Sequence, residues 1–299
     1  MEFLKLIRYK NLFMVLLTMF LTKYALIDSQ IPLASLSSFH FVILSSSVIL
    51  ISVGGYLIND VYDVNTDVIN RPNRLYIDRI ISFKKAKYVS FFTSFTGFLL
   101  GLYLCVINNV LYLIAIYLFC ILSLFLYSYD LKKRILLGNI VISILCSLTI
   151  LLTYLFHVKF LTGTVYYSTS LHKIIIGYAF FAFLTTLIRE IIKDIEDVDG
   201  DLKIKAKTLP IVIGRRRASK VAFLFSCILF FFLFLTLLFF KTYDLILGYG
   251  IFFMLIPLLF FMRKLWVSES KKDFSELSSL LKFIMLSGIL SMILLKIET

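Results

Sequence analysis

Histidine, cysteine, proline and tryptophan are scarce in this chain of 299 residues, which has 3, 4, 4 and 1 of them. The histidines are scattered and no two cysteines form a C-x-x-C pair, so we expect neither a zinc site nor a redox pair. The cysteines all fall in apolar runs, where a thiol is an ordinary small buried side chain. They are Cys105, Cys120, Cys146 and Cys227.

Apolar residues take up 60% of the chain, against roughly 45–50% in soluble domains. Several apolar runs approach the roughly 20 residues that a helix needs to cross a bilayer. We therefore predict an all-α membrane protein, with one bundle of nine transmembrane helices in contact with lipid and a single integral-membrane domain over residues 1–299. The predicted spans are 11–27, 41–59, 88–106, 110–128, 135–156, 174–190, 219–239, 244–262 and 279–295.

The formal net charge of +13 reflects membrane topology rather than nucleic-acid binding. When the loops between the predicted spans are assigned to alternating sides, 26 of the 31 basic residues fall on the side of the N-terminus. Loops rich in Lys and Arg stay in the cytoplasm. We expect a cytoplasmic N-terminus, an outer C-terminus and no nucleic-acid partner, and no feature of the sequence indicates an obligate protein partner.

Two acidic triplets of the form D-x-x-D-x-x-x-D follow the second and sixth predicted spans, on the cytoplasmic side. Nine of the 18 acidic residues lie in these two regions, at 60–67 and 190–201. Offsets of three and seven residues fall on one face of a helix, so each triplet is expected to present three carboxylates together. The triplets are Asp60, Asp63 and Asp67, and Asp194, Asp197 and Asp201.

Both triplets follow the C-terminal end of a helix, where the helix dipole is negative and nearby lipid makes like charges costly. A bound cation removes this conflict, and groups of two or three carboxylates suit Mg²⁺. Arg and Lys flank both triplets and would bind phosphate oxygens. A solvated face with surface ion pairs would explain one triplet, but not two of identical spacing at equivalent helix ends. The pattern therefore favours a metal-dependent site for a diphosphate leaving group.

The two motifs together, N-D-x-x-D-x-x-x-D after the second span and D-x-x-D-x-x-x-D after the sixth, resemble the UbiA family of membrane prenyltransferases. The resemblance covers essentially the whole chain. It implies a helical bundle around a central cavity that opens to the cytoplasm. It also implies Mg²⁺-dependent transfer of a polyprenyl group from its diphosphate to a lipophilic acceptor. The two long cytoplasmic loops carry apolar residues at helical spacing, so we expect short helices in them.

The resemblance assigns roles to individual residues of this chain. Diphosphate binding through Mg²⁺ falls to Asp60, Asp63, Asp194 and Asp197, and the third members Asp67 and Asp201 complete the catalytic set. Direct substrate contacts are expected from Asn59, Arg71, Arg74, Lys193 and Lys207. A Tyr-x-x-x-Lys motif of the family, after the fourth span, is matched either by Tyr127 with Lys132, offset by one residue, or by Tyr129 with Lys133. Asn11 and Asn139, polar positions near the cytoplasmic ends of the first and fifth spans, are candidates to line the same cavity. Ordinary hydrogen bonding between helices would explain them equally well.

The flanks of the motifs are most similar to the digeranylgeranylglyceryl phosphate synthases of that family, which implies a geranylgeranyl donor and geranylgeranylglyceryl phosphate as acceptor. The chain departs from that group after Arg74, where it reads Leu-Tyr-Ile-Asp, and at Lys205. Prenylation of a quinone precursor or of haem is therefore an alternative. A carboxylate-based cation transporter is an alternative from another class. The position of the acids at helix ends, beside Arg and Lys, argues against transport.

Overall fold

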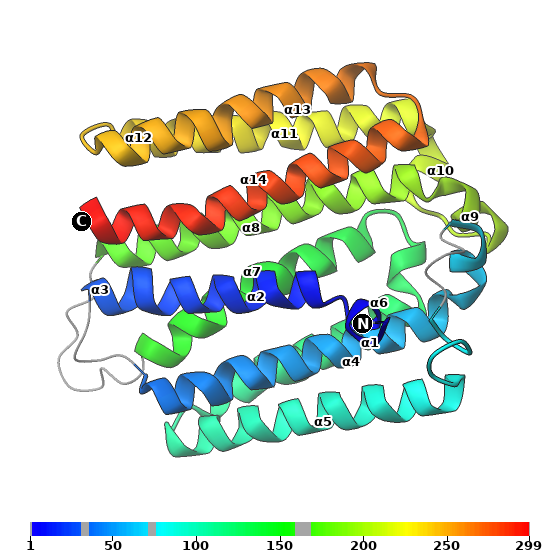
Figure 1. The fold of residues 1–299 in the computed structure, drawn as a ribbon, viewed down its shortest axis with the longest axis horizontal. Helices are drawn as coiled ribbons and strands as arrows, with labels where there is room; N and C mark the ends of the chain where they lie inside the picture. The colour runs from blue at the N-terminus through cyan, green and yellow to red at the C-terminus, as the bar shows by residue number, and fades with distance from the viewer. Residues whose placement is uncertain (1, 31–35, 71–75, 159–168, 299) are drawn as a thin grey trace.

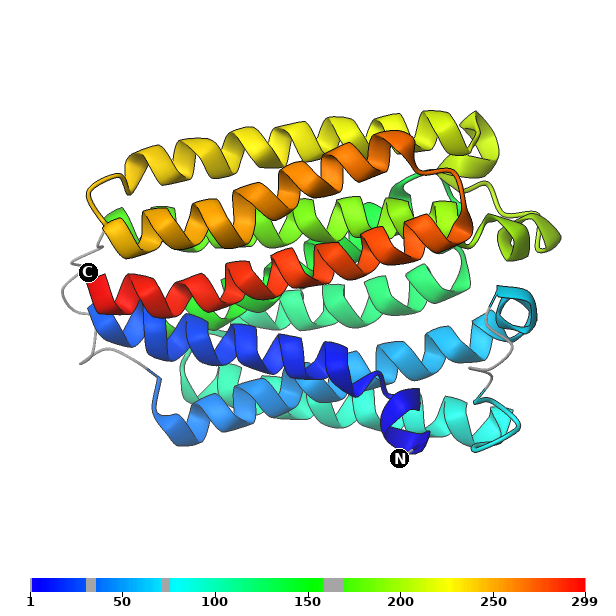
Figure 2. The same ribbon diagram turned by 45° about the horizontal axis from the view of Figure 1, so that its top comes forward.

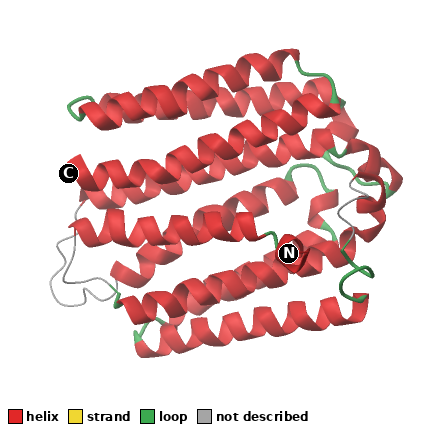
Figure 3. Cartoon of the chain, viewed as in Figure 1, coloured by secondary structure: helices red, strands yellow, loops and turns green. Residues whose placement is uncertain are grey.

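Helices make up nearly all of the computed structural model, which describes residues 2–30, 36–70, 76–158 and 169–298. Within these residues nine helices are long and apolar enough to cross a membrane. They lie side by side in one bundle (Figures 1 and 2), and the described part of the chain contains no strand (Figure 3). The prediction of an all-α bundle with nine membrane-spanning helices is confirmed.

Most spans are single helices, and two are divided by a π-helical turn. In chain order the spans are α2, η1 and α3 (Tyr9–Leu21, Thr22–Ile27, Asp28–Gln30), α4 (Ser38–Asn70), α5 (Phe83–Ile107), η3 with α6 (Leu111–Leu113, Ile114–Tyr129), α7 (Leu137–Val158), α8 (Thr169–Glu196), α11 (Arg215–Phe239), α12, η6 and α13 (Asp244–Gly250, Ile251–Leu255, Ile256–Val267), and α14 (Lys271–Glu298). Shorter pieces are α1 (Glu2–Leu6), η4 (Leu131–Lys133), α9 (Val198–Lys203) and α10 (Leu209–Ile213).

The helices α4 and α8 continue well past the spans predicted for them, because hydropathy marks only the apolar part of a helix. Each runs on into its acidic motif, and both finish at the same end of the bundle, which we call the acidic end (right in Figure 1). The short helices α9 and α10 follow α8 there, as expected. The short helix expected after α4 is absent from the described residues 76–82, which form a turn with an isolated bridge between Ile77 and Ile81.

Small residues allow α4 and α5 to pack closely. The Ser47 hydroxyl donates to the Gly97 carbonyl at 2.5 Å, and the Ser90 hydroxyl donates to the Gly54 carbonyl at 2.7 Å. A Cβ atom added at Gly97 would lie 2.8 Å from the Ser47 carbonyl oxygen, so only glycine fits this contact. Inter-helix contacts of small residues and hydroxyls are typical of membrane bundles, where helices gain little by excluding lipid from each other.

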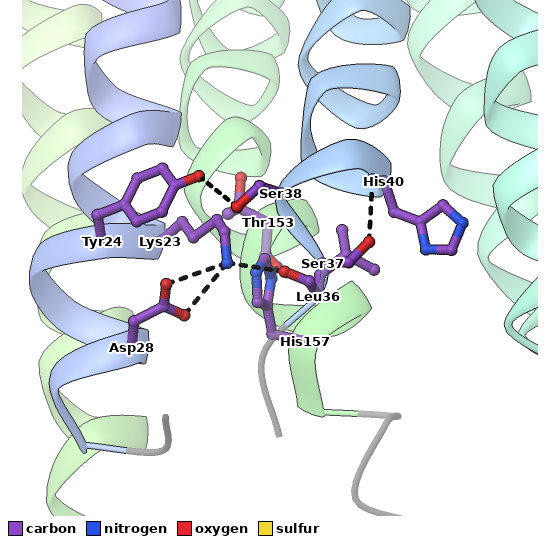
Figure 4. A network of polar contacts seen from close by, with 9 residues as sticks. All are labelled: Lys23, Tyr24, Asp28, Leu36, Ser37, Ser38, His40, Thr153 and His157. Atoms are coloured by element: carbon purple, nitrogen blue, oxygen red, sulfur yellow. Dashed lines mark hydrogen bonds and ion pairs between the residues drawn. The ribbon is translucent and has the colours of Figure 1, made fainter. Parts of the chain in front are cut away.

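A buried lysine holds the opposite end of the bundle together (Figure 4). Lys23 is only 1% exposed, and its ammonium lies 3.0 Å from an Asp28 carboxylate oxygen and donates to the Leu36 carbonyl at 2.8 Å. His157, on α7, lies beside this ion pair in Figure 4, and its Nδ1 donates to the Thr153 carbonyl at 2.5 Å. Lys23, which the count of basic residues assigns to the outer side, therefore links the first span to the start of α4 inside the bundle.

Candidate active site

A polar cavity of about 110 Å³ lies at the acidic end, between the ends of α4, α6, α7 and α8. The elements η4 and α9 complete its wall. Charged and amide side chains dominate the lining. They are Arg8, Asn59, Asp63, Asp67, Asn70, Lys132, Lys133, Asn139, Glu190, Lys193, Asp194, Asp197 and Asp201. Members of both acidic triplets thus face a single cavity, although more than a hundred residues separate them in the sequence.

The first triplet lies on the unbroken helix α4, so its members share one face as the spacing predicts. Asp63 and Asp67 line the cavity. Asp63 forms an ion pair with the Lys132 ammonium and accepts a hydrogen bond from the Asn59 amide at 2.6 Å. Asp60 lies beside the cavity and accepts a hydrogen bond from the Arg8 guanidinium at 2.7 Å. Each of these two carboxylates therefore has a cationic side chain beside it.

The second triplet is arranged differently from the prediction. Helix α8 ends at Glu196, and Asp197 precedes the separate helix α9, so the expectation that one helix presents the whole triplet is wrong. Asp194 lies on α8 and Asp201 lies on α9. All three carboxylates nevertheless line the cavity, because the chain turns between the two helices. The turn folds α9 back over the end of α4.

The Asn70 side chain holds that turn in place. Its amide NH₂ donates to the Asp197 carbonyl at 2.9 Å, and its carbonyl oxygen accepts from the Gly200 backbone N–H at 3.0 Å. A Cβ atom at position 200 would lie 2.3 Å from the Asn70 amide nitrogen, so the contact requires glycine. Asn70 is the last residue of α4, and this pair of bonds therefore joins the first motif to the second.

Polar neighbours also fix the acidic residues of α8. The Asn139 amide donates to the Asp194 carboxylate at 2.8 Å, and Glu190 accepts from Lys193 at 2.6 Å and from Arg189 at 3.1 Å. Asp201 has fewer compensating charges. Burial, together with the charges of Asp197 and Asp63, raises its pKa to about 7. The cavity therefore carries more carboxylate charge than its lysines and arginines neutralise, and a cation would relieve the excess.

The donor set fits a hard divalent cation that binds together with a substrate. Within the described residues no group of three or more His, Cys, Asp or Glu side chains is close enough to form a ready-made metal site. The carboxylates instead line one cavity between ion pairs and amide contacts. Mg²⁺ often has only one or two protein carboxylates as ligands and completes its octahedron with water and substrate phosphates. This arrangement suits such shared coordination.

Most of the residues predicted for the site lie at the cavity. Those that line it are Asn59, Asp63, Asp67, Tyr127, Lys132, Lys193, Asp194, Asp197 and Asp201. Lys207 does not line it, and its backbone N–H donates to the Lys133 carbonyl at 2.7 Å. The predicted phosphate contacts Arg71 and Arg74 lie outside the described residues.

The structure distinguishes the two tyrosines after the fourth span. Tyr127 lines the cavity. Tyr129 is 58% exposed, and its ring lies 5.9 Å from that of Tyr62 and 6.3 Å from that of Phe125, centroid to centroid. Lys132 extends into the cavity to Asp63 and Asn59. Lys133 also lines the cavity but Tyr129 does not, so Tyr127 with Lys132 is the candidate pair of which both members face the cavity.

Two residues at the cavity, Arg8 and Asn70, were not predicted from the sequence. Arg8 precedes the first span and belongs to no motif, and the chain adopts a left-handed conformation there, with φ of 53°. Its guanidinium also lies 5.0 Å from the centre of the Tyr56 ring. Asn70 stands next to the first motif, but its partners lie 127 and 130 residues away. Neither role has a local signal, since both depend on how the helices pack.

Comparison with known proteins agrees with this geometry. The model of the UbiA prenyltransferase family matches residues 11–287. This chain belongs to that family. A digeranylgeranylglyceryl phosphate synthase of Saccharolobus solfataricus is 34% identical over 254 residues, which cover 85% of this chain and 84% of that protein. A synthase of the same name from Methanosphaera stadtmanae is 36% identical over 192 residues, which cover 62% of this chain and 63% of that protein.

Solved structures share the fold. A structure of a digeranylgeranylglyceryl phosphate synthase superposes with a TM-score of 0.66, at 22% identity over 98% of both chains. A UbiA homolog from Archaeoglobus fulgidus bound to GPP and Mg²⁺ has a TM-score of 0.57 and 17% identity, over 98% of this chain and 99% of that one. At these identities the likeness establishes the shared UbiA architecture.

Replacing Asn70 tests the link between the two motifs. We expect Asn70→Ala to increase amide hydrogen exchange in α9, residues 198–203, by about tenfold or more, because two hydrogen bonds of about 1 kcal/mol each are lost. Hydrogen–deuterium exchange with mass spectrometry measures this effect. The control is Asn108→Ala, which removes a local bond to the Leu104 carbonyl after α5 and leaves exchange in α9 unchanged. Unchanged exchange in Asn70→Ala would show that α9 is held by other contacts.

Proposed function

We propose that this protein transfers a geranylgeranyl group from its diphosphate to the free hydroxyl of geranylgeranylglyceryl phosphate, with Mg²⁺ as cofactor. The observation that carries the proposal is the meeting of both aspartate motifs in one cavity with Lys132 and Lys193. Carboxylates with adjacent ammonium groups suit a metal-bound diphosphate better than a bare cation. The names of the two relatives support the choice of acceptor.

Four carboxylates are proposed to hold Mg²⁺ with the diphosphate: Asp60, Asp63, Asp194 and Asp197. The bound metal would neutralise the charge that develops on the leaving diphosphate. Asp67 and Asp201 extend the same carboxylate surface along the cavity wall. Asn139 contributes by fixing the Asp194 carboxylate through its 2.8 Å hydrogen bond.

The cationic side chains are proposed to bind the phosphate oxygens directly. Lys132 and Arg8 are held at the site by Asp63 and Asp60, and Lys193 is held by Glu190. When the diphosphate enters, these groups are positioned to exchange part of their carboxylate contacts for phosphate contacts. Such pre-organised charge favours the transition state, in which negative charge builds up on the leaving oxygen.

The bundle is proposed to protect the allylic carbon from water. The bond between this carbon and the diphosphate oxygen breaks, the acceptor hydroxyl oxygen forms a new bond to the carbon, and the hydroxyl proton leaves. Water that reached the carbon would give the free alcohol instead. Reaction within an apolar helical bundle limits this side reaction and admits two lipid substrates from the membrane.

The acidic end is proposed to face the cytoplasm. The loops and helix ends on that side carry 26 of the 31 basic residues, which is the pattern of cytoplasmic segments. The odd number of spans then places the C-terminus on the outer side. A transporter is disfavoured because the acidic residues lie at helix ends beside Arg and Lys rather than midway along the spans.

Purified protein with labelled geranylgeranyl diphosphate, Mg²⁺ and a panel of acceptors tests the proposal. We expect prenyl transfer to geranylgeranylglyceryl phosphate, abolished by EDTA. Asp194→Ala should lower turnover about a hundredfold or more, because a charged group that stabilises the transition state is lost. Asp244→Ala, an exposed aspartate at the start of α12, is the matched control and should retain full activity.

Near-normal turnover of Asp194→Ala, or transfer that persists in EDTA, would contradict the proposed site. Transfer only to an aromatic acceptor would overturn the choice of acceptor but not the prenyl-transfer reaction. Diphosphate release without any acceptor would show that water reaches the allylic carbon.

The two tyrosines provide a second test within the same assay. Tyr127→Phe removes a hydroxyl from the cavity lining and should lower turnover about tenfold, the effect of losing roughly one hydrogen bond in the transition state. Tyr129→Phe removes a hydroxyl from an exposed ring and should leave turnover unchanged. The reverse order of effects would assign the role to Tyr129 with Lys133.

A further inference from the structure

A second cavity, of about 280 Å³, lies at the acidic end between α11, α13 and α14. Three basic side chains from the first turns of α11 line it: Arg215, Arg216 and Lys220. Its other wall is aromatic and apolar, with Phe223 of α11 and Trp266 of α13. No residue of the two acidic motifs lines this cavity, so it is separate from the candidate active site.

The cavity carries an excess of positive charge. Arg215 forms an ion pair of 2.8 Å with Asp199. Within the described part of the chain no ion pair to Arg216 or Lys220 is found, and both side chains are exposed. Glu269 is the one acidic residue among the lining residues. At least one basic group of this cavity therefore lacks a compensating charge from the described protein.

The apolar wall of the cavity is well packed. The Phe223 and Trp266 rings meet edge to face, with centroids 5.2 Å apart. Behind them Leu265 and Phe274 are 1% and 2% exposed. Trp266 itself is 67% exposed and lies near the end of α13. Near the ends of transmembrane helices, tryptophan favours the boundary between lipid and water. The cavity thus combines a basic rim with an aromatic wall that reaches toward the membrane.

We infer that this cavity binds the phosphate headgroup of an anionic membrane lipid. Basic pockets between transmembrane helices bind such headgroups, because anionic lipid is concentrated at the same surface. A soluble anion would use the basic rim but would gain nothing from the aromatic wall, whereas the glycerol and first chain carbons of a lipid can pack against it. The inference rests on the membrane location of the protein and on the proposed cytoplasmic position of the acidic end, and not on the proposed transfer reaction.

The single tryptophan of the chain makes the test direct, because all tryptophan fluorescence comes from Trp266. The protein is reconstituted in phosphatidylcholine vesicles and titrated with spin-labelled phosphatidic acid or with equally labelled phosphatidylcholine. We expect the labelled phosphatidic acid to reach half-maximal quenching at a mole fraction about tenfold lower than the labelled phosphatidylcholine does. Arg216→Gln/Lys220→Gln should abolish this preference, since each basic residue near the surface contributes about a factor of five. Arg215 is left intact because it also contacts α9 through Asp199.

The matched control is Arg217→Gln/Arg263→Gln, which removes the same charge from exposed positions that do not line the cavity. This control should keep the preference for the anionic lipid. Quenching by labelled phosphatidylcholine should be equal in the wild-type protein and all variants, which shows that they are folded and inserted alike. If the double variant does not fold, the single variant Arg216→Gln replaces it. Its preference for the anionic lipid should be about fivefold weaker than that of the wild-type protein.

Three results would overturn the inference. The first is equal quenching of the wild-type protein by both lipids. The second is an equal loss in the control pair, which would show general attraction of anionic lipid to a basic surface. The third is displacement of the labelled lipid by millimolar glycerol phosphate, which would identify a soluble phosphate as the ligand.

Discussion

The architecture of the acidic end depends on the compensation of carboxylate charge beside a low-dielectric membrane. Like charges gathered there repel each other, and few waters are available to screen them. Each described contact at the site reduces that cost: Arg8 pairs with Asp60, Lys132 pairs with Asp63, and the Asn139 amide binds Asp194. The compensation is incomplete, because more acidic than basic side chains line the cavity. Burial and the charges of Asp197 and Asp63 accordingly raise the pKa of Asp201. We propose that the remaining negative charge attracts a divalent cation and, through that cation, a diphosphate.

Besides charge compensation, the cavity requires that two distant segments of the chain lie together. Asn70 and Gly200 meet this requirement with two hydrogen bonds and a contact that a side chain at position 200 would prevent. The contacts of Lys23 at the other end of the bundle have a comparable structural role, because they fix the first span against the start of α4. Arg8 directly precedes that span. The geometry of the cavity thus rests on amide and ion-pair contacts between helices whose apolar surfaces alone would permit sliding.

The number of spans and many of the residues that line the cavity can be predicted from the sequence, because both leave local signals. Apolar runs mark the helices, and the repeated aspartate spacing marks the cavity. The break at Asp197 is not contained in the aspartate spacing, which fits one continuous helix. Asp199-Gly200 is a local turn signal that the spacing does not take into account, and Asn70 holds the resulting turn. Arg8 and the choice of Tyr127 over Tyr129 likewise depend on tertiary packing. The count of basic residues also assigned Lys23 to the outer side of the membrane, because a buried ion pair cannot be recognised from one charged residue.

The most direct test of this account is a double-mutant cycle on the binding of geranylgeranyl diphosphate in the presence of Mg²⁺, measured by isothermal titration calorimetry. Asp63→Asn and Asp194→Asn each alter one motif, and the double variant alters both. If the motifs form one metal–diphosphate site, binding is lost non-additively, with a coupling energy of about 1 to 3 kcal/mol. Additive losses, or full affinity in either single variant, would show that the two motifs do not act on the same ligand.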